Sequence, residues 1–213
     1  MEELKSSNAT LVAVSKTKPV SDIEELYNLG QRDFGENYVQ ELVEKHTQLP
    51  QDIRWHFIGH LQTNKVKSIA PFVNLVHGVD SFKLLKGINK QAEKNNRIID
   101  SLLQVHIAAE ETKFGFDENE LDNLFTNNKA EIESLKNIRI TGLMGMASFT
   151  DDQHKIKSEF QQLKNIFDKH KDLSISNCNL SVLSMGMSGD YKLAIEKGST
   201  MVRIGSLLFG ARK

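Results

Sequence analysis

The stretch Leu11-Val12-Ala13-Val14-Ser15-Lys16-Thr17-Lys18-Pro19 is the most informative part of this sequence. Its first four residues are small or apolar, a pattern typical of a fully buried β-strand. Lys16 follows almost at once, and Pro19 ends the run. Because apolar surroundings disfavour the ammonium form, an amine at the end of a buried strand can become a nucleophile for aldehydes. Taken alone, the stretch favours the simpler interpretation, in which Lys16 is the first solvated residue after a strand.

The change from strand to helix recurs along the whole chain. Strands are expected at 11–14, 33–37, 54–60, 75–79, 101–108, 138–146, 180–186 and 201–205. Helical periodicity is expected at 21–29, 39–43, 63–69, 82–92, 118–124, 156–167 and 189–198. Ser21 and Glu24 are expected to form a capping box on the first of these helices. Since no repeat or low-complexity linker interrupts the alternation, the sequence predicts an α/β fold, a single (β/α)8 TIM barrel over residues 1–213, with an open doubly wound sheet as the alternative.

Composition excludes several classes of function. The chain carries 27 basic and 28 acidic residues, and this net charge of -1 argues against nucleic-acid binding. No apolar run reaches the length of a bilayer span and the start is acidic, so neither a membrane segment nor a signal peptide is expected. The single cysteine, Cys178, cannot form an internal disulfide, which favours a reducing cytoplasm. Because no histidine stands beside Cys178 in the sequence, a nucleophilic role is not expected for it.

Functional groups of a parallel barrel gather where its strands end. The residues expected there are Lys16, Asn37, His60, Asp80, Met144, Ser188 and the turn from Arg203 to Ser206. The loops at 186–190 and 205–206 contain glycine and serine, which suits the phosphate site that barrels often build after strands seven and eight. A buried Arg203 needs an acceptor, which either a strand-end carboxylate or a ligand could provide.

Three familiar catalytic patterns fail on inspection. Residues 186–190 nearly match the nucleophile elbow of hydrolases, but Asp190 replaces its final glycine. His56 and His60 have the spacing of a zinc-binding helix, yet they fall on an expected strand, where they would lie far apart. No glycine-rich nucleotide-binding loop is present. We therefore expect no hydrolase, metal or nucleotide site.

Six segments carry a resemblance to a known family: AVSKTKP (13–19), FGENYVQE (34–41), WHFIGHLQTNK (55–65), GLMGM (142–146), SMGMSGDYKLAI (184–195) and GSTMVRIGSLLFGAR (198–212). In this order they resemble the YggS/PROSC family of pyridoxal-phosphate-binding homeostasis proteins over nearly the whole chain. The resemblance implies the barrel of fold type III pyridoxal-phosphate enzymes, similar to the alanine racemase barrel without its second domain.

The resemblance also implies roles for individual residues. Lys16 would form a Schiff base with the aldehyde of pyridoxal 5′-phosphate, and Ser188 with the backbone of Gly205 and Ser206 would hold the phosphate. Arg203 would face the pyridine nitrogen, where it disfavours protonation and weakens the ring as an electron sink. Such a ring suits storage and transfer of the cofactor better than amino-acid chemistry. The expected cofactor-binding residues are Lys16, Asn37, Met144, Ser188, Arg203, Gly205 and Ser206.

The function expected from this resemblance is a cytoplasmic carrier, monomeric or weakly dimeric, that keeps pyridoxal 5′-phosphate available to apoenzymes. The alternative is a pyridoxal-phosphate-dependent racemase, which needs proton-transfer groups on both faces of its substrate. Racemases of this fold take the second group from a tyrosine of an additional domain, for which this chain leaves no length. Its own Tyr27, Tyr38 and Tyr191 lie in or beside expected helices. A barrel without any cofactor is the third possibility.

Two departures from the family pattern carry expectations. Only residues 1–8 precede the first strand, and the chain stops at Lys213 soon after the last, so one flank is expected to be less covered and to favour a dimer contact. Gly189 stands where an aspartate is common, which is expected to loosen the helix start on the phosphate side while keeping Ser188.

Overall fold

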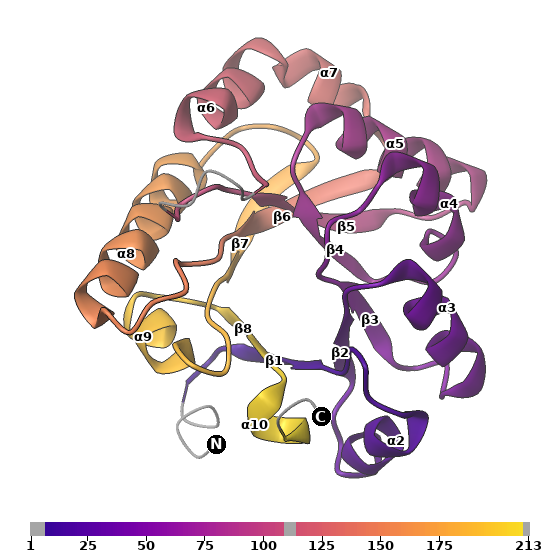
Figure 1. Cartoon of the computed structure of the whole chain (residues 1–213). Helices are drawn as coiled ribbons and strands as arrows, with labels where there is room; N and C mark the ends of the chain where they lie inside the picture. Colours follow the sequence, from indigo (N-terminus) through magenta and orange to yellow (C-terminus); the bar gives the residue numbers. More distant parts are fainter. Residues whose placement is uncertain (1–6, 109–113, 211–213) are drawn as a thin grey trace.

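Parallel strands close into one barrel in sequence order, with the last strand paired to the first (Figure 1). The computed structural model describes residues 7–108 and 114–210. The strands are β1 (Thr10–Val14), β2 (Asp33–Glu36), β3 (Arg54–Phe57), β4 (Leu75–Val79), β5 (Ile99–Gln104), β6 (Ile138–Met144), β7 (Cys178–Ser184) and β8 (Met201–Ile204). The predicted (β/α)8 barrel is confirmed, and the open sheet is wrong.

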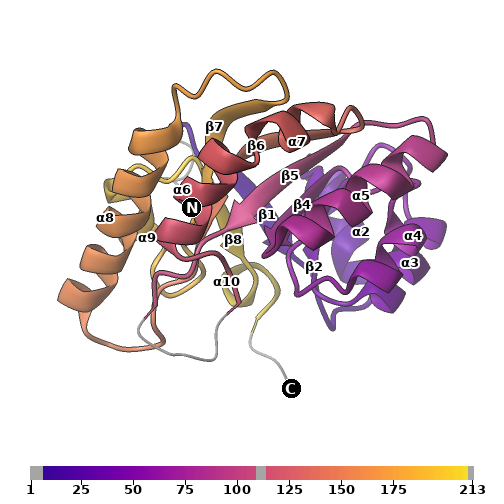
Figure 2. The same ribbon diagram turned by 90° about the horizontal axis from the view of Figure 1, so that it is seen from above.

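Helices surround the barrel and connect successive strands, as both views show (Figures 1 and 2). They are α2 (Val20–Asn28), α3 (Val39–Gln48), the 3-10 turn η1 (Thr63–Lys65), α4 (Val66–Ile69), α5 (Phe82–Lys94), α6 (Glu118–Asn127), α7 (Lys129–Ser134), α8 (Gln153–His170), α9 (Tyr191–Glu196) and α10 (Ser206–Phe209). The sequence did not predict α7, a short second helix before β6. Within residues 7–108 and 114–210, no helix has the length and apolarity to cross a bilayer.

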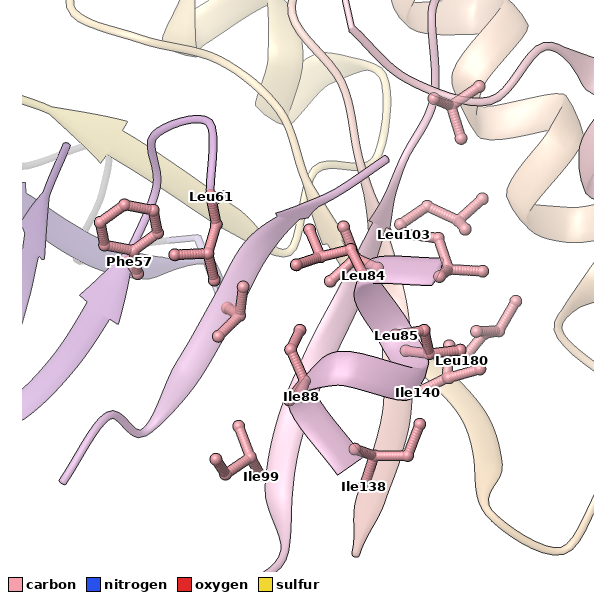
Figure 3. Packing of buried hydrophobic residues seen from close by; sticks show 14 of the residues in the cluster. Phe57, Leu61, Leu84, Leu85, Ile88, Ile99, Leu103, Ile138, Ile140 and Leu180 are labelled. Atoms are coloured by element: carbon pink, nitrogen blue, oxygen red, sulfur yellow. The ribbon is translucent and has the colours of Figure 1, made fainter. Parts of the chain in front are cut away.

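The main core lies between the sheet and its helices. Figure 3 shows α5 presenting Leu84, Leu85 and Ile88 toward strand residues, and all three are at most 1% exposed. Their spacing places them on one face of the helix. The facing strand residues include Ile99, Leu103, Ile138 and Ile140. Each aliphatic side chain buried in this way stabilises the fold by about 1.5–3 kcal/mol, which fixes the helices against the barrel.

The barrel interior has a separate apolar cluster and, beside it, buried polar groups. The apolar cluster is Val12, Leu75, Leu102, Met144 and Met201. On β8, Val202 and Ile204 pack outward with Tyr191, while Met201 and Arg203 occupy the alternate positions. This alternation places Arg203, only 4% exposed, inside the barrel.

Several predicted boundaries need correction. Helix α2 begins at Val20 after Pro19 and has no side-chain cap, so the predicted capping box of Ser21 and Glu24 is wrong. Proline has its φ fixed near the helical value, and the helix can therefore start before Ser21 is reached. Strand β5 ends at Gln104, since the chain then bridges to Phe116 instead of continuing the ladder. The expectation for the segment before β1 falls mostly on residues 1–6, which lie outside the described residues. After β8 the described chain contains only the four-residue helix α10, and residues 211–213 lie outside the described part.

Candidate functional site

A cavity of about 390 Å³ opens at the carboxyl ends of the strands, around the junction of β1 and β8. Six of the seven predicted site residues line it: Lys16, Asn37, Ser188, Arg203, Gly205 and Ser206. They follow or belong to four different strands, so closure of the barrel is what brings them together. The other lining residues are Val14, Lys18, Ile58, Met146, Phe149, Met187, Gly189 and Gly210.

Met144 is the predicted site residue that does not line this cavity. It is the last residue of β6, 1% exposed, and packs in the apolar cluster of the barrel interior. Met146, two residues further on, lines the cavity. Side chains two residues apart point to the same side of a strand, so Met144 and Met146 face the same way. Met144 lies deeper in the barrel than the cavity wall. Strand β6 ends two residues earlier than the sequence suggested, which moves the cavity wall from Met144 to Met146.

The backbone that carries Lys16 is held by a buried ionic cluster. Lys45 of α3 donates from Nζ to the Ser15 carbonyl (2.7 Å), to Glu36 Oε1 (2.8 Å) and to Glu41 Oε1 (2.7 Å). The Ser15 hydroxyl also donates to Glu36 Oε1, at 2.6 Å. We call Ser15, Glu36, Glu41 and Lys45 the Lys45 clamp. It fixes the residue immediately before Lys16 from two directions.

The residue after Lys16 is fixed as well. The Thr17 N–H donates to Glu41 Oε1 at 2.5 Å, and Thr17 has a φ of 63°, in the left-handed region. A β-branched residue seldom adopts this conformation, and it persists only where the surroundings enforce it. Burial, opposed by hydrogen bonds from Lys45 and Ser15, raises the pKa of Glu36. The turn that presents Lys16 is therefore enforced by buried charges.

Arg203 lies at the cavity wall with most of its guanidinium buried. Its Nη1 donates to the Ser184 carbonyl (2.9 Å) and to Ser184 Oγ (2.7 Å), and its Nη2 donates to the Gly145 carbonyl (3.1 Å). Burial lowers the pKa of Arg203 to about 10, with Asp190 acting in the opposite direction, so the group is cationic at neutral pH. Within residues 7–108 and 114–210 no carboxylate lies within 4 Å of it. A guanidinium has five N–H donors, and two remain for a ligand.

The loops after β7 and β8 meet at the other side of the cavity. Ser188 Oγ accepts from the Gly205 N–H at 3.2 Å. Gly186 has a φ of +94°, and a Cβ there would lie 2.5 Å from that of Ala194, so only glycine fits this turn. Asp190 Oδ1 accepts from the Met187 N–H and closes the loop. Position 189 has open space around it, and the turn is closed without a side chain there.

Two other candidates lie outside the cavity. His60 pairs with Asp80 (Nδ1 to Oδ2, 3.0 Å) and stacks on Phe114, in a neighbouring groove that it shares with Asn37. Cys178 is buried, and burial raises the pKa of its thiol to about 12, so it is no nucleophile. Among the described residues no cluster of histidine, cysteine and carboxylate side chains could hold a metal ion.

Comparison with known proteins agrees with the predicted family. The family model of the alanine racemase N-terminal domain matches residues 1–213. A pyridoxal phosphate homeostasis protein of Aquifex aeolicus is 42% identical over 207 residues, which are 96% of this chain and 88% of that protein. One of Schizosaccharomyces pombe is 39% identical over 209 residues, covering 96% and 85%. This chain belongs to the pyridoxal phosphate homeostasis protein family.

Solved structures agree with this placement. PipY of Synechococcus elongatus, determined with PLP bound, has a TM-score of 0.85 and 32% identity, with 98% of this chain and 97% of that chain covered. The alanine racemase of Clostridium difficile has a TM-score of 0.75 at 15% identity, and the match covers 96% of this chain and 52% of that chain. The second likeness concerns the fold alone.

Sequence reasoning missed several parts of the site. Lys18 and Met146 each lie two residues after a predicted site residue. Because every second residue of a strand points to the same side, the strand period could have predicted that they also line the cavity. Gly59 was also missed: a Cβ there would lie 2.3 Å from the Asn37 carbonyl oxygen, so this glycine allows two strand-end loops to touch. The Lys45 clamp had no sequence signal beyond a lysine on a helix.

Proposed function

We propose that this chain binds pyridoxal 5′-phosphate reversibly through Lys16, and thereby stores the cofactor and keeps its free concentration low. The observation that carries the proposal is the single cavity in which Lys16, from the start of the chain, meets Arg203 and Ser188, from its end. The name of the family and the relative that was determined with PLP bound support the same assignment.

The residues fit the chemistry of this molecule. An amine for the aldehyde comes from Lys16, and hydroxyl groups for the phosphate come from Ser188 and Ser206. Arg203 offers two N–H donors to the acceptor nitrogen of the ring. Lys16 would hold the cofactor through its aldehyde, which would supply a reversible condensation with the amine, one water being lost on binding and regained on release. The chain would supply the position of the reacting amine and the groups that hold the phosphate and the ring.

A racemase fits the site less well. None of the tyrosines lines the cavity in the described part of the chain. The Tyr27 hydroxyl donates to Asp52 at 2.7 Å, Tyr191 is buried in a hydrophobic cluster, and Tyr38 lies in the neighbouring groove. A second proton-transfer group opposite Lys16 is therefore not supplied by the residue type that this fold would use. The relatives' names as homeostasis proteins agree with a carrier that is not an enzyme.

Further features of the carrier are proposed from the sequence. We place it in the cytoplasm, as one domain over residues 1–213 and as a monomer or weak dimer, with pyridoxal-phosphate-dependent apoenzymes as recipients. The near absence of cysteine supports the reducing compartment. The exposed Phe149 and Met187 at the cavity mouth support contact with a recipient.

Borohydride trapping tests the assignment. Protein mixed with pyridoxal 5′-phosphate should develop a visible absorption band, and reduction followed by peptide mapping should place one adduct on Lys16. The Lys16→Ala variant should lose the band. In Lys18→Ala, which changes another lysine of the same cavity, the adduct should remain on Lys16. A reducible adduct in Lys16→Ala, or adducts scattered over surface lysines, would show that the assignment is wrong.

A further inference from the structure

A continuous line of hydrogen bonds crosses the barrel interior and ends on Arg203. Asp33 Oδ1 lies 3.0 Å from His56 Nε2, and His56 Nδ1 lies 2.9 Å from His77 Nε2. His77 Nδ1 lies 3.2 Å from Ser184 Oγ, which accepts from Arg203 Nη1 at 2.7 Å. We call Asp33, His56, His77, Ser184 and Arg203 the barrel relay. Every member is at most 8% exposed, although polar groups are costly to bury, so the line needs an explanation.

The hydrogen bonds of the relay have one consistent direction. Arg203 can only donate, so Ser184 Oγ accepts and its own hydrogen is left for His77 Nδ1. The one hydrogen of a neutral His77 then lies on Nε2 and is donated to His56 Nδ1. By the same rule His56 donates from Nε2 to the carboxylate of Asp33. Both rings can thus be neutral and fully satisfied.

Charges at the two ends fix this direction. Burial alone would raise the pKa of Asp33, but hydrogen bonds from Arg54 and His56 outweigh it and hold the pKa at about 2, so Asp33 is an anion. Burial, His56 and Arg203 together lower the pKa of His77 well below its ordinary value, so this ring is neutral. With an anion at one end and a cation at the other, this arrangement gives every group of the barrel relay a hydrogen-bond partner.

We propose that Asp33, His56, His77 and Ser184 are positioning residues that hold the Arg203 guanidinium in the orientation that binds the ring nitrogen of pyridoxal 5′-phosphate. The inference rests on the proposed function. Because His77 takes the Ser184 hydrogen, a lone pair of Ser184 Oγ is held toward Arg203 Nη1. Together with the Ser184 and Gly145 carbonyls, it occupies three N–H groups of the guanidinium and leaves the other two for a ligand in the cavity that Arg203 lines.

Ser184→Ala tests the relay with a small change, since the Arg203 bond to the Ser184 carbonyl remains. We expect the variant to bind pyridoxal 5′-phosphate about tenfold more weakly, the effect of one hydrogen bond to a charged group, and to shift its absorption band. In 1-deazapyridoxal 5′-phosphate the ring nitrogen is replaced by carbon. The variant and the unchanged protein should bind this analogue with equal affinity. Asp33→Asn, at the far end of the relay and outside the cavity, should show the same selectivity with a smaller loss.

Ser101→Ala is the matched control, because Ser101 is also a fully buried strand serine and its hydroxyl has no hydrogen-bond partner in the described structure. It should leave both affinities unchanged. Equal losses for the two ligands in Ser184→Ala, or no loss for either, would overturn the relay. The unchanged protein separates this failure from that of the proposed function, since a borohydride-reducible adduct on its Lys16 establishes cofactor binding whatever the variants do.

Discussion

Replacing Lys45 by methionine removes the cation at the centre of the Lys45 clamp. Its side chain is 6% exposed and that of Glu36 is 0% exposed, so the variant leaves a carboxylate buried without its partner. Removing one member of a buried ion pair costs about 3–5 kcal/mol, a large part of the roughly 5–15 kcal/mol by which a domain is stable. We expect a loss of this size in the free energy of unfolding, measured by urea denaturation at neutral pH.

The pH dependence of the loss gives a second measure. The pKa of Glu36 is already raised by burial, and without Lys45 it should rise further. A carboxyl whose pKa is higher in the folded state binds more protons there, so stability falls as pH rises from the ordinary value through the folded pKa. Lys45→Met should therefore lose less stability at about pH 5 than at about pH 8. Adding Glu36→Gln should recover part of the loss.

Lys169→Met is the control for this prediction. Lys169 also contacts two carboxylates, Glu118 and Asp122, but its side chain is 46% exposed. Exposed pairs contribute at most about 1 kcal/mol, so this variant should be nearly as stable as the unchanged protein. Equal and small losses in Lys45→Met and Lys169→Met would refute the view that buried charges enforce the Lys16 turn.

Two further predictions concern the barrel itself. Because burial raises the pKa of Cys178 to about 12, a thiol reagent at about pH 8 should label it only after unfolding, and rapid labelling of the native protein would contradict its position. Gly142→Ala should destabilise the protein by about 3 kcal/mol or more in thermal unfolding, because its Cβ would lie 1.8 Å from the Val182 carbonyl oxygen. Gly189→Ala, where no atom lies within 4 Å of an added Cβ, is the control and should change stability little.

The barrel could be predicted from sequence because its signals are local. Each strand is a short apolar run and each helix has its own periodicity, so the order of elements and the alternation on β8 follow from residues close in the chain. Lys16 and Ser188 could be placed at the cavity for the same reason. The assignment of Met144 failed because the end of β6 depends on its neighbours: its pairing with β7 shifts register between Ile140 and Gly142.

The barrel relay and the Lys45 clamp had no comparable signal. His56 and His77 come from neighbouring strands, but Ser184 lies 107 residues beyond His77 and meets it only across the closed barrel. Which interior side chains touch depends on the tilt and stagger of the strands, and these are properties of the whole sheet. In the sequence alone, a buried lysine such as Lys45 likewise cannot be distinguished from a lysine on a solvated helix face.

The pairing of β1 with β8 has a consequence for biosynthesis. Lys16 leaves the ribosome long before Arg203 and Ser206 are translated, although β1 and β8 are paired in the folded barrel. A chain that is still being translated can form early strands and helices, since folding proceeds from the N-terminus. It cannot yet surround a reactive aldehyde, because the wall opposite Lys16 does not exist. On the proposed function, capture of the cofactor would therefore begin only after β8 has been translated and has paired with β1.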